Sequence, residues 1–166
     1  TFTLDTSVAA PVIALTADTG SSETDGITST GAYTVSGTEP GALVEYSTDG
    51  ISWTTTPPTA VEGANTIQVR QTDVAGNVSA PATLTFTLDT TVAAPTIALE
   101  ADTGSSGTDG ITSTGAYTVT GTELGAVVEY STDGISWSTT APVAVEGANT
   151  IQVRQTDVAG NVSAPA

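Results

Sequence analysis

An internal repeat constrains this chain more than any other feature. Residues 1–82 align with residues 85–166 at a constant offset of 84 residues, and only 10 of the 82 aligned positions differ. A period of this length is typical of one whole domain per copy, rather than one turn of a solenoid. We therefore expect two copies of one small module, over residues 5–88 and residues 89–166.

The ends of the chain fall at different points of the module. Residues 1–4 repeat the sequence of residues 85–88, so they are expected to be the tail strand of a preceding repeat. The second copy stops at Ala166, and its last strand is therefore expected to be truncated. No charged and apolar leader opens the chain, which favours an excerpt from a longer array of repeats.

Each copy shows the alternation of apolar and polar residues that is typical of β-strands. Every second residue of Thr83-Leu84-Thr85-Phe86-Thr87-Leu88 is apolar, and Thr66-Ile67-Gln68-Val69-Arg70 has the same period. Asp49-Gly50, which lies between two such runs, is a strong hairpin signal. Helix signals are almost absent, so the sequence predicts an all-β fold.

Seven strands are predicted in the first copy, over residues 11–17, 32–38, 42–47, 51–55, 58–62, 65–72 and 82–88. This pattern is typical of an immunoglobulin-like fold. The predicted architecture is two tandem immunoglobulin-like seven-strand β-sandwiches arranged end to end. The core is expected to consist of the inward-facing residues Ile13, Leu15, Tyr33, Val35, Val44, Tyr46, Trp53, Ile67, Val69, Leu84, Phe86 and Leu88.

Two side chains of the first copy could have either a structural role or a role in ligand binding. Arg70, its only basic residue, is expected to pair with Glu45 across the outer face of a sheet, at a gain below about 1 kcal/mol. Recognition of an anionic ligand is the alternative. Trp53 is expected to pack in the core or at its rim, and stacking on a carbohydrate is the alternative.

Composition excludes several classes of function. The chain has 2 basic and 18 acidic residues, and its net charge of −16 repels nucleic acid and anionic lipid. It contains no His and no Cys, so the common catalytic triads and transition-metal sites are not expected. Calcium or magnesium, which prefer oxygen ligands, are the expected metals. No apolar run is long enough to cross a membrane, so no direct membrane insertion is expected.

The acids are expected to gather at the ends of the module. Because successive strands reverse direction, the loops over residues 37–41 and 73–77 are predicted at one end of a copy. The 18–30 loop, the Asp49-Gly50 turn and the exit at Asp89 are predicted at the other. Where one copy follows another, these acidic and amide residues are expected to meet: Asp18, Asp25 and Asp89, with Glu123, Asp157 and Asn161. Crowded carboxylates repel one another unless a cation lies among them, which favours calcium.

Two alternatives apply to these acids. Asp, Gly, Ser and Thr also form turns without any ligand, and this reading holds for Asp49-Gly50 in particular. A catalytic pair of carboxylates is not expected, because such pairs need a cleft with an apolar wall, and the loops of a small sandwich leave no sequence to build one. The chain is therefore not expected to be an enzyme.

Three stretches carry a resemblance to a known family. They are Asp89-Thr90-Thr91-Val92-Ala93-Ala94-Pro95, residues 102–112 and residues 153–163. This series resembles the bacterial Ig-like extender repeats of giant repeats-in-toxin adhesins, which leave the cell by type I secretion. The resemblance covers both copies, and its most specific parts are the Thr-Asp-x-Ala-Gly-Asn-x-Ser element and the linker Asp-Thr. The linker itself has no acid over residues 90–95, in contrast to related repeats.

The resemblance implies a stalk outside the bacterial cell. Such repeats hold terminal ligand-binding domains away from the outer membrane, in biofilm formation or host attachment, and calcium often stiffens the joints between them. The implied partners are adjacent identical repeats of the same chain, in a monomeric rod. The alternative function is a carbohydrate- or protein-binding module. The implied calcium ligands are Asp5, Asp18, Asp25, Asp73, Asp89, Asp102, Asp109 and Asp157.

Overall fold

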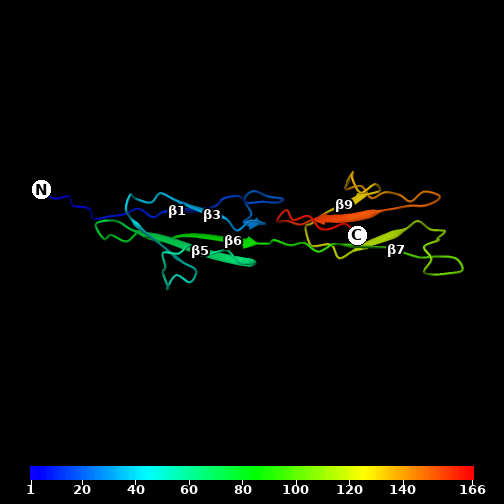
Figure 1. Ribbon diagram of the computed structural model, residues 1–166, viewed down its shortest axis with the longest axis horizontal. Helices are drawn as coiled ribbons and strands as arrows, with labels where there is room; N and C mark the ends of the chain where they lie inside the picture. The colour runs from blue at the N-terminus through cyan, green and yellow to red at the C-terminus, as the bar shows by residue number, and fades with distance from the viewer. The chain divides into compact units, whose positions relative to one another are not determined.

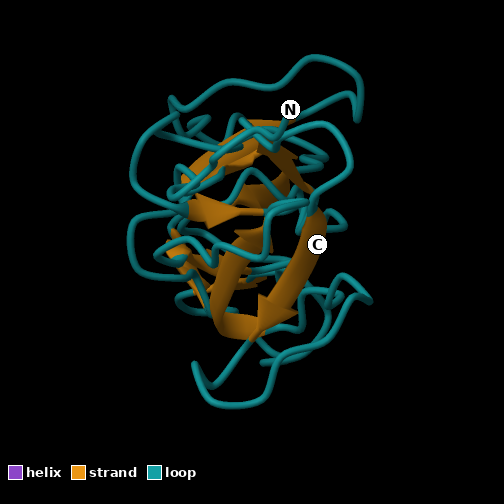
Figure 2. Cartoon of the chain, turned by 90° about the vertical axis from the view of Figure 1, so that its left-hand side faces the viewer, coloured by secondary structure: helices purple, strands orange, loops and turns teal.

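The protein consists of strands and loops. A computed structural model describes all residues from Thr1 to Ala166, and it contains no helix (Figure 2). The prediction of an all-β fold is therefore confirmed. No helix capable of crossing a membrane is present. The chain divides into two compact units, unit 1 over Thr1–Thr90 and unit 2 over Thr91–Ala166.

Unit 1 has two sheets. Its strands are β1 (Val12–Leu15), β2 (Ile27–Thr28), β3 (Tyr33–Ser36), β4 (Leu43–Ser47), β5 (Gly63–Thr72) and β6 (Ala82–Leu88). β1 pairs with β3, and the other sheet has the order β2-β6-β5-β4. All pairs are antiparallel except β2 with β6, which is parallel. The β1–β3 sheet lies over β5 and β6, as in a two-layer sandwich (Figure 1).

The hydrophobic core of unit 1 lies between these two layers. Ile13 of β1 packs with Ile67 and Val69 of β5 and with Phe86 and Leu88 of β6, and all five are buried. The alternate residues of β6 are threonines, which face outward as the two-residue period requires. Every predicted core residue except Trp53 belongs to this cluster or packs against it.

Trp53 is partly buried, but it is not among the residues that pack against the core cluster. The Cζ atom of Arg70 is 4.1 Å from the centroid of its ring, and Nη2 of Arg70 is 3.0 Å from Oε2 of Glu45. The register of β4 and β5 places Glu45 opposite Arg70, so the predicted ion pair is confirmed. Because the guanidinium covers one face of the indole, that face is not open for stacking on a sugar.

Two of the seven predicted strands are wrong. Residues 51–55 contribute only an isolated bridge between Thr54 and Tyr46, and residues 58–62 form no strand. Pro57 and Pro58 lack the N–H groups that a strand needs there. The two-residue strand β2 was not predicted, because its parallel pairing with β6 joins residues far apart in the sequence.

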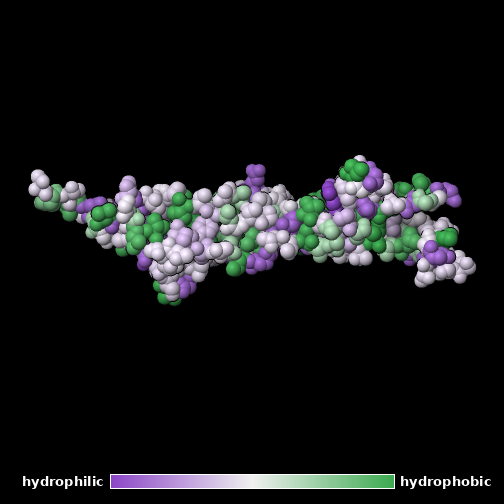
Figure 3. Space-filling view, viewed as in Figure 1, coloured by the Kyte–Doolittle hydropathy of each residue, from purple (hydrophilic) through white to green (hydrophobic).

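Unit 2 has fewer paired residues. Its strands are β7 (Thr96–Leu99), β8 (Tyr117–Thr120), β9 (Val127–Ser131) and β10 (Gln152–Thr156). β7 pairs with β8, and β9 pairs with β10. β10 is 5 residues long, whereas its equivalent β5 has 10. Large hydrophobic side chains reach the surface of both units (Figure 3).

Candidate cation site

The inward face of β5 changes from apolar to polar along the strand. Ile67 and Val69 face the core, and the next residues on the same face are Gln71 and then Asp73, just beyond the strand. These four residues are 2%, 0%, 0% and 7% exposed. The two-residue period of the strand thus places an amide and a carboxylate in the interior at one end of the sandwich.

Gln71 holds the backbone around this end. Its Nε2 donates to the carbonyl oxygens of Ala9 at 2.8 Å and Gly37 at 3.2 Å. Its Oε1 accepts from the N–H of Glu39 at 2.8 Å. The side chain therefore ties together the segment before β1, the end of β3 and the following loop. In unit 2, Gln155 makes the same bonds with Ala93, Gly121 and Glu123.

Asp73 is held by the turn that follows it. The backbone N–H of Asn77 donates to Oδ1 of Asp73 at 2.8 Å, and Nδ2 of Asn77 donates to Oδ2 at 2.7 Å. Nδ2 of Asn77 also donates to the carbonyl oxygen of Asp5 at 3.2 Å. The φ of +94° at Gly76 is a conformation that favours glycine, which explains the Asp-Val-Ala-Gly-Asn sequence of this turn.

The same hydrogen bonds stabilise the ionised form of the buried carboxylate. The side-chain amide of Asn77 is the largest cause of a lowered pKa at Asp73, and backbone N–H groups of the turn lower it further. Asp73 therefore stays charged at neutral pH although it is buried. The ionised carboxylate is a group that a cation could approach.

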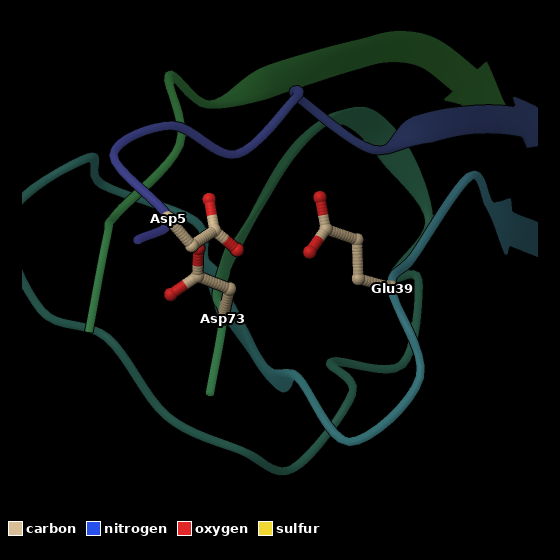
Figure 4. A group of neighbouring side chains, drawn as sticks. All are labelled: Asp5, Glu39 and Asp73. Atoms are coloured by element: carbon tan, nitrogen blue, oxygen red, sulfur yellow. The ribbon is translucent and has the colours of Figure 1, made fainter. Parts of the chain in front are cut away.

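Three carboxylates meet at this end of unit 1. Asp5 comes from the segment before β1, Glu39 from the loop between β3 and β4, and Asp73 from the loop between β5 and β6. One oxygen of each lies within 4.8 Å of the others. Figure 4 shows the carboxyl groups of Asp5 and Asp73 side by side, with that of Glu39 turned toward them.

These three carboxylates could hold a cation such as Ca²⁺. Ca²⁺ binds oxygen at about 2.3–2.6 Å, so two oxygens on opposite sides of one ion are about 5 Å apart. The oxygens of Asp5, Glu39 and Asp73 fall within that separation. Asp5 is exposed and Glu39 is partly buried, which leaves the site open to the water ligands that would complete a shell of six to eight oxygens.

The 18–26 loop lies apart from this group. Oδ2 of Asp18 accepts from the N–H of Gly26, and Oδ1 of Asp25 accepts from the N–H of Ile27, both at 2.9 Å. Oδ1 of Asp18 is buried and accepts no hydrogen bond, and the same is true of Oδ1 of Asp102 in unit 2. Asp109 repeats the contact of Asp25, since its Oδ1 accepts from the N–H of Ile111.

The two remaining predicted ligands also have defined places. Asp157 repeats the environment of Asp73: Asn161 donates to Oδ1 through its backbone and to Oδ2 through its side chain. The N–H of Asp89 donates to the carbonyl oxygen of Thr28, directly after β6. By the offset of 84 residues, Asp89, Glu123 and Asp157 are the sequence equivalents of Asp5, Glu39 and Asp73.

Residues 5–90 match the family model of the bacterial Ig-like domain. The chain belongs to this family. The match begins at Asp5, before β1, and ends two residues after β6. The bacterial Ig-like domain therefore includes Asp5, Glu39 and Asp73. A search of the curated proteins finds no matching relative.

Two residues of this bacterial Ig-like domain were missed by the sequence prediction. Glu39 was not among the predicted ligands, although its equivalent Glu123 was placed at the joint. Gln71 was not selected at all. Its position in the strand could have identified it, because Gln71 lies two residues after Val69, on the face where an apolar residue is expected.

The acid of the Asp49 turn has a structural role. Oδ1 of Asp49 accepts from the N–H groups of Ile51 and Ser52 and from the hydroxyl of Ser47. The backbone N–H of Ile51, followed by that of Ser52, lowers the pKa of Asp49 well below its usual range. In unit 2, Asp133 forms the same turn, with its pKa lowered in the same direction.

We expect these two turns to make stability sensitive to acid. A carboxylate with a lowered folded-state pKa contributes stability above the unfolded-state pKa of about 3.9, and this contribution is lost as the pH falls below that value. In the double variant Asp49→Asn and Asp133→Asn, the amide oxygen keeps the acceptor but does not titrate. The free energy of unfolding, measured with urea at several pH values between neutral pH and pH 2, should therefore fall less steeply for the variant than for the parent. Equal slopes of free energy against pH in the two proteins would contradict this.

Proposed function

We propose that this chain is part of an extracellular stalk on a bacterial cell surface, in which its bacterial Ig-like domains act as spacers. The near-identity of the two copies supports this most strongly, since only 10 of 82 aligned positions differ. A spacer gains length from copy number, whereas copies that each bind a ligand tend to diversify. The chain acts without catalysis, and ligand-binding domains elsewhere in the protein make the attachment.

The surface of unit 1 also supports a spacer over a carbohydrate-binding module. Aromatic residues are 5% of the chain. Tyr33 and Tyr46 pack against the core and line a cavity of about 460 Å³, in which Thr59 is the one other residue with a polar side chain. The guanidinium of Arg70 covers one face of Trp53. A carbohydrate site needs an open aromatic platform or a pocket with convergent polar groups.

The spacer proposal is tested with chains of two, four and eight copies. Small-angle scattering should give a maximum dimension that increases in proportion to the number of copies. A maximum dimension that increases only as the cube root of the copy number would mean that the copies collapse onto one another, and it would overturn the proposal.

We further propose that Asp5, Glu39 and Asp73 bind one calcium ion and thereby fix the segment before β1 to the sandwich. Binding would relieve the repulsion among three carboxylates that no Lys or Arg approaches in the repeat, since the single Arg of unit 1 pairs with Glu45. Because the residues recur at Asp89, Glu123 and Asp157, the same role is proposed for each repeat.

Calorimetric titration should show that the double variant Asp5→Asn and Glu39→Gln binds one calcium ion fewer per chain than the parent does. Neither carboxylate takes part in the Asn77 turn, so the fold is expected to persist. Glu23→Gln is the matched control, because Glu23 is an exposed acid outside the group and its equivalent in the second copy is Gly107. An unchanged stoichiometry in the double variant would rule out this site and leave the spacer proposal intact.

A further inference from the structure

Four Asp-Gly pairs are chemically reactive points of this backbone. They are Asp25-Gly26, Asp49-Gly50, Asp109-Gly110 and Asp133-Gly134. In such a pair the glycine nitrogen can attack Cγ of the aspartate, because the glycine has no Cβ to hinder the approach. A bond from nitrogen to Cγ forms, and one carboxyl oxygen leaves as water with its own proton and that of the nitrogen. Addition of water to the resulting succinimide gives aspartate or isoaspartate.

The turns of unit 1 require this reactive sequence. The φ of Gly26 is +71° and that of Gly50 is +73°, a conformation that favours glycine. The aspartate before each glycine closes its turn, since its Oδ1 accepts from the N–H two residues later, that of Ile27 at 2.9 Å and that of Ile51 at 2.8 Å. The fold therefore needs both members of each pair, and it must keep them from reacting.

In the Asp49 turn, one hydroxyl holds both reacting groups. Oγ of Ser47 accepts from the N–H of Gly50 at 2.8 Å and donates to Oδ1 of Asp49 at 2.8 Å. The N–H of Ser52 donates to the same Oδ1 at 2.7 Å. Ser47 is 3% exposed, so water has little access to its hydroxyl. The glycine nitrogen and the carboxyl group are thus each bound to another partner.

The charge of the carboxyl group also opposes the reaction. A neutral carboxyl group can release water, whereas a carboxylate would have to release an oxide ion. The backbone N–H of Ile51, followed by that of Ser52, holds the pKa of Asp49 well below its usual range. Asp49 is therefore ionised near neutral pH, in the form that reacts least.

The other turn of unit 1 holds its glycine nitrogen with a different partner. The N–H of Gly26 donates to Oδ2 of Asp18 at 2.9 Å. Unit 2 repeats both arrangements, with Gly110 bound to Asp102 at 2.9 Å and Gly134 bound to Ser131 at 2.8 Å. The glycine nitrogen of every Asp-Gly pair therefore donates to a side-chain oxygen, which is a carboxylate in one turn and a hydroxyl in the other.

We propose that Ser47 and Asp18, with their equivalents Ser131 and Asp102, protect the Asp-Gly pairs from rearrangement to isoaspartate. The rearrangement adds one atom to the backbone of the turn and moves the carboxylate away from the N–H groups that it holds. Protection keeps the geometry of both turns intact in a chain that contains each of them twice. This role uses Oδ2 of Asp18 as a hydrogen-bond acceptor and needs no bound cation.

Incubation of the 166-residue chain below its unfolding temperature, with a chelator, tests the proposal. Cleavage after Glu places the four pairs in four different peptides, and mass spectrometry with electron-transfer fragmentation measures isoaspartate in each. In Ser47→Ala, isoaspartate at Asp49 should form about tenfold faster than in the parent, which corresponds to the loss of about one hydrogen bond. Asp25 and Asp133 should keep the parent rate in the same sample, because their own partners are unchanged.

The matched control is Thr48→Ala, which removes an exposed hydroxyl of the same turn and should leave the rate at Asp49 unchanged. Asp18→Ala should accelerate the reaction at Asp25 alone, whereas Asp18→Asn, whose amide oxygen still accepts, should not.

Two results would overturn the proposal. An unchanged or slower reaction at Asp49 in Ser47→Ala would mean that the hydroxyl does not protect the pair, and a slower one that it carries the proton of the nitrogen. Equal acceleration of Asp25 and Asp49 in Ser47→Ala and in Asp18→Ala would mean that the folding of unit 1 as a whole, rather than these two acceptors, sets the rates.

Discussion

Replacement of Gln71 by leucine, together with Gln155 by leucine, is expected to lower the free energy of unfolding of each unit by about 1–3 kcal/mol. The leucine side chain has a similar volume, so the main cost comes from the hydrogen bonds that are lost. The N–H of Glu39 and the carbonyl oxygens of Ala9 and Gly37 lose their partner. Ala9 and Gly37 are exposed, so water can replace part of what their carbonyl groups lose, and the cost is that of about one buried group without a partner. Urea unfolding measures the loss.

The control is Thr66→Leu with Thr150→Leu, two exposed and equivalent residues, of which Thr66 lies on the outer face of β5. This change should alter stability by less than about 1 kcal/mol, because surface substitutions have small effects. Hydrogen exchange adds a local readout: the amide of Glu39 should exchange faster in Gln71→Leu than in the control. Equal stabilities of the two double variants would mean that Gln71 does not hold the segment before β1 in place.

Phe86→Ala is expected to destabilise unit 1 by about 3–5 kcal/mol, because it leaves a cavity between the sheets and removes apolar surface that β6 buries. Phe86 belongs to the buried core cluster, together with Ile67, Val69 and Leu88. Hydrogen exchange with mass spectrometry resolves the two units, so the faster exchange should appear along β5 and β6. Exchange along β10 of unit 2 should be unchanged in the same sample.

Phe2→Ala is the matched control for this substitution. Phe2 has the same neighbours in sequence, Thr-Phe-Thr-Leu, but it is 91% exposed, whereas Phe86 is 5% exposed. The control should therefore leave the stability of unit 1 within about 0.5 kcal/mol of the parent. A comparable loss in both variants would show that residues 1–4 contribute to the core of unit 1, contrary to the burial seen here.

Local patterns predicted most of the core correctly. The alternation of β5 and β6 identifies Ile67, Val69, Phe86 and Leu88, because a strand with one buried face has a period of two residues. Strand parity also predicted that the loops over residues 37–41 and 73–77 share one end. The structure confirms this, since Glu39 and Asp73 meet there.

Other features depended on residues far apart in the chain. The pattern over residues 51–55 resembles a strand, but it gains only one bridge, and the equivalent segment of unit 2 also gains only one, although Ala141 replaces Pro57 there. β2 has only two residues, and it forms because β6 lies beside it in parallel. Neither outcome is contained in a local pattern, since each depends on which partner strand is available.

The repeat, the all-β class and the inward face of each long strand were determined by the sequence alone, because these follow from an exact offset and from a period that each strand carries by itself. Tertiary structure decided which acids meet. Asp5, Glu39 and Asp73 come from three separate segments, and the bonds of Gln71 and Asn77 to the backbone bring these segments together. Asp18 and Asp25 are loop acids as well, but Oδ2 of Asp18 and Oδ1 of Asp25 accept hydrogen bonds from backbone N–H groups of their own segment.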